Sequence, residues 1–250
     1  MKLLAVAYGA ICYVVFFLTF LYAIGFVGDL AVPKTIDSGF AGPLAMSLVI
    51  DALLLGVFAV QHSVMARPAF KAWWTRFVPP PVERSTYVLF ASLALILIFW
   101  QWRPLPSLVW RLQSPALAGV VWVLFAAGWL TVLTSTFLIN HFDLCGLRQV
   151  WAYRRNREIP PADFRTPLFY RVVRHPIYLG FIIAFWAAPT MSLGHLVFAA
   201  ATTAYILIAI QLEEHDLVAA FGDRYRVYRE QVAMIVPVPK LRGVRTRNVS

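Results

Sequence analysis

The chain has 250 residues, of which 60% are hydrophobic and only 14% are charged. An ordinary soluble chain is about 25% charged and about 45–50% apolar. The composition therefore predicts a protein that folds in a lipid bilayer, and it excludes disordered, collagen-like and disulfide-stapled classes. The net charge of +10 would suggest a nucleic-acid partner for a soluble protein, but these charges follow a membrane topology instead.

Six apolar stretches follow one another along the chain. They cover residues 3–28, 44–66, 86–102, 115–139, 177–192 and 195–212. A helix needs about 20 residues to cross the hydrocarbon, with about 17 as the lower limit, and the last two stretches are short. We therefore expect an all-α, polytopic transmembrane helix bundle of five to six spans, with the last two forming a helical hairpin. A cleaved signal peptide is the alternative for the first stretch, but that stretch exceeds the usual apolar region of about 7–15 residues.

Basic residues alternate between successive loops. Nineteen Lys and Arg residues lie at residue 2, in loops 67–84 and 140–175 and in the tail 214–250, whereas three lie in the alternate loops. Because cytoplasmic loops carry an excess of Lys and Arg, both termini are expected to be cytoplasmic. Topology accounts for the charge without nucleic acid, and the cationic surface is expected to contact anionic membrane lipids.

Reactive side chains gather at the predicted cytoplasmic ends of the apolar stretches. They are His62, His141, Asp143, His175, Glu213 and Glu214, with the glutamates closing the sixth stretch. Polar residues also occur at helix ends simply because the membrane interface is hydrated. Their density at one level favours a shared site that cytosolic cofactors and membrane-soluble substrates can both reach.

The His175-Pro176 step marks the start of a helix, because proline is favoured at the first helical position. The free N–H groups of that first turn would suit an anion such as a carboxylate. Tyr178 lies one turn from His175 on the same face. The alternative is a membrane helix with an interfacial tyrosine and no ligand.

Carboxylates beside or within apolar stretches need partners, because a charge in the hydrocarbon costs about 2.5–3.5 kcal/mol. For Glu213 and Glu214, either the ribose hydroxyls of a nucleotide cofactor or a nearby arginine would serve. Asp51 is expected about 10 Å inside the second span, where it is either functional or bonded to a serine or tryptophan of another helix.

Motifs of the soluble nucleotide and zinc classes do not occur in the sequence: it has no Gly-x-Gly-x-x-Gly, P-loop, Cys-x-x-Cys or His-Glu-x-x-His. No metal site is expected. A haem held by His62 and His141, or a small-solute transporter that uses Asp51, remain as non-enzymatic alternatives.

The segment Arg174-His175-Pro176-Ile177-Tyr178-Leu179-Gly180, with Glu213-Glu214 and Phe221-Gly222 downstream, resembles the isoprenylcysteine carboxyl methyltransferase family over about residues 165–237. The resemblance implies a single membrane domain, 1–250, with a cofactor-binding part at 165–240 and a substrate-side part at 1–164. It also implies S-adenosylmethionine as the cofactor. The cofactor-binding residues would be Tyr170, Arg174, His175, Pro176, Ile177, Tyr178, Glu213 and Glu214.

The substrate-side part looks instead like the NnrU-related branch, and within it like bacterial enzymes that methylate a small thiol. This similarity rests on the segments beginning Gln61-His62-Ser63, Glu83-Arg84-Ser85 and Asn140-His141-Phe142. It implies conversion of methanethiol to dimethyl sulfide in the bacterial inner membrane, at a site facing the cytoplasm. A prenylcysteine or lipid methyltransferase on the same scaffold is the alternative.

Thiol methylation needs a group that favours the thiolate over the thiol. His141, oriented by Asp143, is the first candidate for the base, and His62 is the second. Arg148 is expected to hold either the thiolate or the carboxylate of the cofactor.

Overall fold

The computed structural model describes residues 1–160 and 163–237. Five of its helices are long and apolar enough to cross a membrane, so the chain is an integral membrane protein. These helices are α1 (Lys2–Gly28), α2 (Leu44–Ala66), α4 (Pro80–Gln101), α5 (Pro115–Ile139) and α9 (Leu193–Phe221). Residues 238–240 of the predicted cofactor-binding part lie outside the described residues.

Shorter elements connect the long helices. The helical ones are α3 (Pro68–Trp74), α6 (His141–Leu144), α7 (Leu147–Arg154), the 3₁₀ turn η1 (Leu168–Arg171), α8 (Pro176–Trp186) and α10 (Asp223–Gln231). Two short strands, β1 (Leu108–Arg111) and β2 (Thr190–Ser192), pair antiparallel. The predicted all-α bundle is confirmed, and this single strand pair is a small addition that no sequence pattern indicated.

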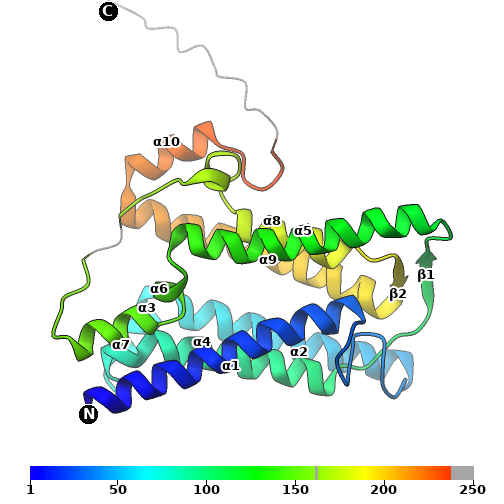
Figure 1. The fold of residues 1–250 in the computed structure, drawn as a ribbon, viewed down its shortest axis with the longest axis horizontal. Helices are drawn as coiled ribbons and strands as arrows, with labels where there is room; N and C mark the ends of the chain where they lie inside the picture. Colours follow the sequence, from blue (N-terminus) through cyan, green and yellow to red (C-terminus); the bar gives the residue numbers. More distant parts are fainter. Residues whose placement is uncertain (161–162, 238–250) are drawn as a thin grey trace, which may run out of the picture.

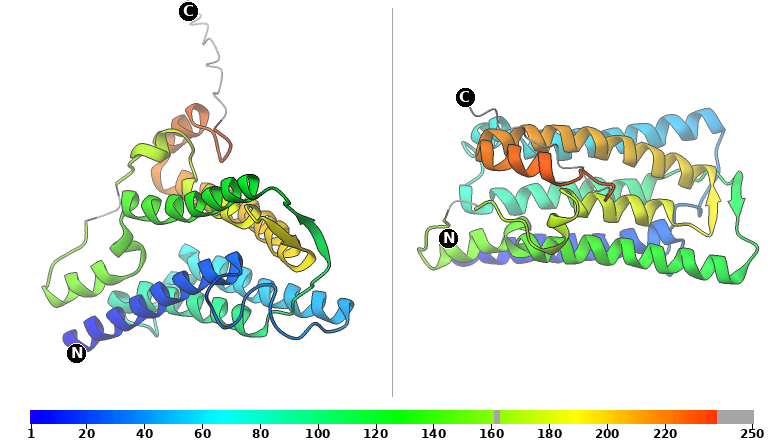
Figure 2. Two further views of the ribbon diagram at one scale, coloured as in Figure 1. Left: turned by 45° about the vertical axis from the view of Figure 1, so that its right-hand side comes forward. Right: turned by 90° about the horizontal axis from the view of Figure 1, so that it is seen from above.

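The long helices form two layers (Figures 1 and 2). In one layer α4 packs against both α1 and α2, and in the other α8 packs against both α5 and α9. Contacts between α2 and α9 join the layers. The start of α1 lies at the same end of the bundle as α3, α6, α7 and α10, whereas β1 and β2 lie at the opposite end. We call the end of the bundle that carries α3, α6, α7 and α10 the α10 end.

The hairpin of the last two apolar stretches differs from its predicted boundaries. Helix α8 ends at Trp186, three residues before Pro189, and is too short to count among the candidate spans. Helix α9 does not stop before Glu213 but continues to Phe221, where Gly222 takes a positive φ of 56°. The glutamates close the apolar stretch, as the sequence indicates, but the helix continues past them, and partners from outside α9 satisfy Glu214 within it.

Asp51 is fully buried in α2, and its Oδ1 accepts a hydrogen bond of 2.8 Å from the backbone N–H of Arg103. The expected serine or tryptophan partner is not the one observed. The bond joins α2 to the segment that follows α4, at the end of the bundle opposite α10. Around it, aromatic residues such as Phe26, Phe99 and Trp102 fill the main core.

Helices α5 and α8 approach closely at two glycines. A Cβ atom on Gly128 would lie 2.7 Å from the carbonyl oxygen of Gly180, and one on Gly180 would lie 2.7 Å from the carbonyl oxygen of Gly128. Small residues allow membrane helices to approach in this way. The contact fixes α8, whose first turn carries His175, against α5.

A side chain at this contact should therefore destabilise the protein. We expect Gly128→Val to lower the free energy of unfolding by about 1–3 kcal/mol, the usual cost of overpacking, measured by thermal unfolding in detergent. Gly119→Ala in the same helix is the control, because a Cβ atom added to Gly119 would have no neighbouring atom within 4 Å. Equal stability of the two variants would contradict the close contact.

Candidate active site

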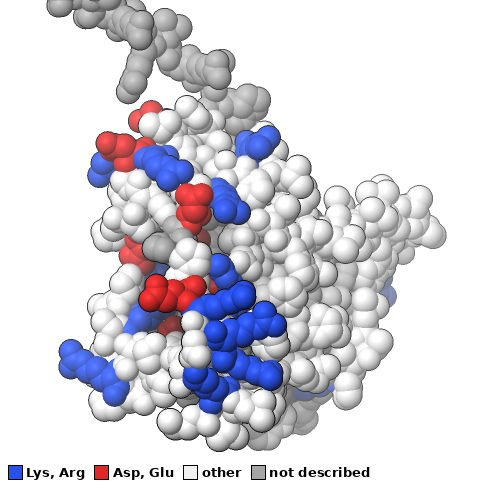
Figure 3. All heavy atoms as spheres, turned by 60° about the vertical axis from the view of Figure 1, so that its left-hand side comes forward, with Lys and Arg blue, Asp and Glu red and all other residues white. Residues whose placement is uncertain are grey.

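A cavity of about 630 Å³ lies between the two helix layers, with lining residues from α1 to α6, η1, α8 and α9. Its volume is in the range of small-molecule sites, about 300–1,000 Å³. The cavity lies towards the α10 end, where the Lys, Arg, Asp and Glu side chains gather in Figure 3. Eight of the predicted site residues line it. They are His62, His141, Tyr170, Arg174, His175, Ile177, Tyr178 and Glu213.

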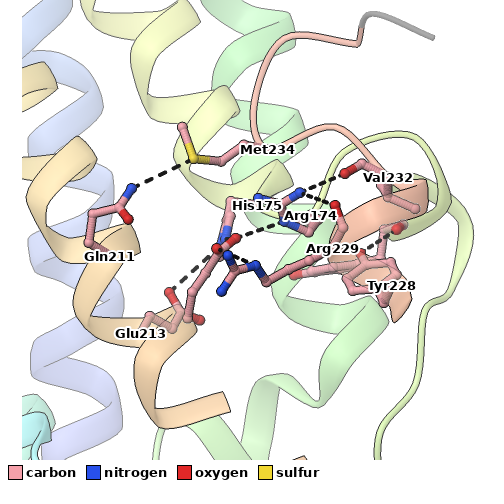
Figure 4. Close-up of polar contacts among 10 residues, drawn as sticks. Arg174, His175, Gln211, Glu213, Tyr228, Arg229, Val232 and Met234 are labelled. Atoms are coloured by element: carbon pink, nitrogen blue, oxygen red, sulfur yellow. Dashed lines mark hydrogen bonds and ion pairs between the residues drawn. The ribbon is translucent and has the colours of Figure 1, made fainter. Parts of the chain in front are cut away.

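A buried ionic network anchors one wall of the cavity (Figure 4). The Arg174 guanidinium donates from Nε to Glu214 Oε1 at 2.7 Å, and His175 Nε2 lies 3.1 Å from the same oxygen. Arg229 Nε lies 3.4 Å from the other carboxylate oxygen of Glu214. The sequence left ribose hydroxyls or an arginine as partners for the glutamates, and Glu214 binds arginine. Glu214 does not line the cavity.

The chain after α10 is held against the start of α8. The backbone N–H groups of Arg174 and His175 donate to the carbonyl oxygens of Ala233 and Met234, at 2.8 and 3.2 Å. Arg174 Nη1 donates to the carbonyl oxygens of Arg229 and Val232, at 3.0 and 2.6 Å (Figure 4). These bonds fix the backbone on which His175 is carried.

Glu213 differs from its neighbour because its side chain is 43% exposed and lines the cavity. Its Oε2 lies 3.8 Å from His175 Nδ1, whereas Glu214 Oε1 lies beside Nε2 of the same ring. The ring of Tyr178 lies 5.6 Å from that of His175, as the helical spacing predicted. Glu213 also interacts with the Tyr178 side chain, and its exposed carboxylate is accessible to a further donor in the cavity.

Tyr170 is placed in the same wall by η1 and by α10. The hydroxyl of Tyr228 donates to its carbonyl oxygen at 2.5 Å, and its own hydroxyl lies 3.5 Å from the carbonyl oxygen of Ser135. Burial, followed by the Glu213 carboxylate, raises the pKa of Tyr170. The phenol therefore stays neutral and can donate a hydrogen bond.

His141 is the first residue of α6, just after the end of α5, and its side chain lines the cavity. Its Nδ1 lies 2.9 Å from the Thr136 hydroxyl and its Nε2 lies 3.1 Å from the Tyr13 hydroxyl. Because the Thr136 hydroxyl donates to the carbonyl oxygen of Leu133, it accepts from Nδ1–H, and Nε2 accepts from Tyr13. Burial lowers the pKa of His141, so the neutral form with an unprotonated Nε2 is favoured.

The expected pairing of His141 with Asp143 is not observed. The Asp143 carboxylate accepts hydrogen bonds from Arg148 at 3.1 Å and from Gln149 at 2.8 Å. Neither Asp143 nor Arg148 lines the cavity. The sequence analysis assigned Asp143 and Arg148 separate roles, and spacing along the chain did not show that their charges would pair.

His62 lies on the α2 side of the cavity in contact with Tyr87. The Tyr87 hydroxyl is 3.0 Å from His62 Nε2, and the rings of His62 and Phe58 stack at 5.1 Å. The sequence analysis missed Tyr87, together with Lys71, Arg84 and Tyr205, which also line this wall. Lys71 and Arg84 lie in a basic segment that the topology alone accounted for, and Tyr87 lies in a predicted apolar stretch, where a single tyrosine gave no signal.

The described residues contain no cluster of three or more His, Cys, Asp or Glu side chains arranged to hold a metal ion. The polar groups around the cavity are instead hydroxyls, imidazoles, cations and the carboxylates of Glu213 and Asp216. Such a set suits an organic ligand that carries several polar groups.

Comparison with known proteins gives matches along most of the chain. The NnrU protein family matches residues 51–239. A methanethiol S-methyltransferase of Mycobacterium tuberculosis is 57% identical over 95% of this chain and 98% of its own length. Methanethiol S-methyltransferase 1 of Bradyrhizobium diazoefficiens is 58% identical over 94% and 83%.

A more distant relative is nurim of Mus musculus, 32% identical over 68% of each chain. No solved structure matches. Because the family match covers residues 51–239, well over half of the chain, the chain belongs to the NnrU family.

Proposed function

We propose that this protein transfers a methyl group from S-adenosylmethionine to methanethiol and so forms dimethyl sulfide. The observation that carries the proposal is one cavity that joins the His175–Glu213 wall, the neutral imidazole of His141 and an apolar surface formed by Phe16, Phe17 and Phe20. Relatives named methanethiol S-methyltransferase match nearly the whole chain and favour the same substrate.

The residues of the His175–Glu213 wall fit such a cofactor. Glu213 offers carboxylate oxygens to hydroxyl or ammonium donors, and Tyr170, Ile177 and Tyr178 add aromatic and apolar surface beside it. Pro176 begins α8, and Arg174 and Glu214 hold His175 in place. When bound, S-adenosylmethionine supplies a methyl group on a positively charged sulfur.

His141 is the proposed base for the thiol. Thiols are largely protonated near neutral pH, and the thiolate is the nucleophile. The Tyr13 hydroxyl first gives up its hydrogen bond to Nε2 of His141. Nε2 then accepts the S–H proton of methanethiol, and the thiolate sulfur can attack the methyl carbon of the donor. Nδ1–H stays bonded to Thr136 and keeps the ring oriented. Asp143 and Arg148 join α6 to α7 in this proposal.

The cavity is proposed to face the cytoplasm of the bacterial inner membrane. The α10 end carries α3, α6, α7 and α10 (Figure 1), which belong to the basic segments of the sequence. An excess of Lys and Arg marks cytoplasmic loops. A polar cofactor would then reach the cavity from the cytosol.

The direct test is a methyl-transfer assay on purified protein. With S-adenosylmethionine and methanethiol, we expect equal amounts of dimethyl sulfide, measured by headspace gas chromatography, and S-adenosylhomocysteine. A prenylated cysteine is offered in parallel as the acceptor. Turnover of the prenylated compound without turnover of methanethiol would show that the acceptor is wrong and the methyl donor right.

Glu213 should contribute to cofactor affinity. We expect Glu213→Gln to weaken the binding of S-adenosylhomocysteine about tenfold or more, because a hydrogen bond to a charged group contributes about 1.5–3 kcal/mol. Isothermal titration calorimetry measures the change. Glu230→Gln removes a carboxylate from an exposed position of α10 and serves as the control. An unchanged affinity in Glu213→Gln would remove this residue from the site.

His141 should contribute to turnover rather than to cofactor binding. We expect His141→Ala to lower kcat by about 10²–10⁴-fold, the usual contribution of a general base, while the affinity for S-adenosylhomocysteine stays within about twofold. His215→Ala is the control, since that side chain is 85% exposed. Normal turnover in His141→Ala would show that His141 is not the base and would leave His62 as the candidate.

The assignment of His141 as the base also predicts how kcat/KM changes at acidic pH. The pKa of His141 is lowered by burial, so the imidazole remains a base as the pH falls below the ordinary histidine value of about 6.5. We expect kcat/KM for methanethiol to decline only below that value. A decline that begins above pH 7 would contradict a neutral, buried base.

A further inference from the structure

A wall of the cavity carries two cations without acidic partners. Lys71 of α3 and Arg84 of α4 both line it, and within the described residues neither forms an ion pair. Arg84 is fixed by a 2.9 Å hydrogen bond from Nε to the carbonyl oxygen of Leu144, and its guanidinium lies 4.9 Å from the centroid of the Tyr87 ring. The terminal nitrogens of Arg84 and the ammonium of Lys71 remain to be satisfied.

The charges around these two cations do not compensate them. Arg67, the third cation of this wall, donates to Asp216 at 2.8 Å and to the carbonyl oxygen of Leu212, so Asp216 is already paired. Glu83 is the other acidic neighbour of Lys71, but among the described residues it forms no ion pair with Lys71 or Arg84. Burial, followed by the positive charge of Arg84, lowers the pKa of Lys71. A partly desolvated, unpaired cation is unfavourable, and a bound anion offsets that cost.

The wall formed by the start of α8 has the opposite character. Glu213 places an exposed carboxylate 3.8 Å from His175, directly beside the first turn of that helix. A second carboxylate bound there would be repelled, although the helix terminus alone would attract it. An anionic group in the cavity is therefore directed towards Lys71 and Arg84, and hydroxyl or cationic groups are directed towards Glu213.

We propose that Lys71 and Arg84 form the subsite for the α-carboxylate of the methyl donor, whose remaining polar groups reach the His175–Glu213 wall. This inference rests on the proposed function, because it assigns one end of the same ligand. It replaces the helix terminus and Arg148, which the sequence suggested for this carboxylate.

The test compares two ligands on the intact protein in detergent. One is S-adenosylhomocysteine, and the other is the analogue in which hydrogen replaces the α-carboxylate. We expect the unaltered protein to prefer S-adenosylhomocysteine by about ten- to a hundredfold, the range for hydrogen bonds to a charged group. Lys71→Met should remove most of this preference by weakening only the carboxylate ligand, and Arg84→Gln should act in the same direction.

The matched control is Arg76→Met, which removes an exposed cation just beyond α3 that does not line the cavity. It should leave both affinities unchanged. Retained affinity for the decarboxylated analogue shows that Lys71→Met is folded. A preference that survives in both Lys71→Met and Arg84→Gln, or an equal loss for both ligands, would overturn the subsite alone. Failure of the unaltered protein to bind either ligand would overturn the proposed function and the subsite with it.

Discussion

The buried contact between Arg174 and Glu214 is the interaction on which the site depends. It joins the residue before His175 to the C-terminal part of α9, and the same guanidinium binds carbonyl oxygens at the end of α10 and directly after it. Removing one member of a buried ion pair commonly costs about 3–5 kcal/mol, because the other charge is left uncompensated. Here that loss would also release the backbone that positions His175.

This arrangement explains why two adjacent glutamates have different environments. Successive residues of a helix lie about 100° apart, so Glu213 and Glu214 point in different directions from α9. Glu214 points at Arg174 and is almost fully buried, whereas Glu213 points into the cavity and stays accessible. One carboxylate stabilises the wall, and its neighbour is available to a ligand on that wall.

The apolar stretches predicted the long helices well, because crossing a membrane imposes a length and a hydrophobicity that are visible in sequence. Proline before Ile177 likewise marked the start of α8. The end of α9 was missed, since the carboxylate within it is compensated by an arginine 40 residues away. The Asp143–Arg148 pair was not foreseen for a related reason: Asp143 was expected to orient His141 and Arg148 to hold a ligand, whereas in the fold the two side chains pair with each other.

Lys71 and Arg84 show the remaining limit of sequence reasoning. The positive-inside rule accounted for every basic residue of the predicted loop 67–84, so none of them stood out as functional. In the fold these cations have different surroundings: Arg67 is paired with Asp216, Arg76 is exposed, and Lys71 and Arg84 face the cavity. A residue can therefore satisfy the topology rule and still bind a ligand, and only the pairing of charges in three dimensions separates the two roles.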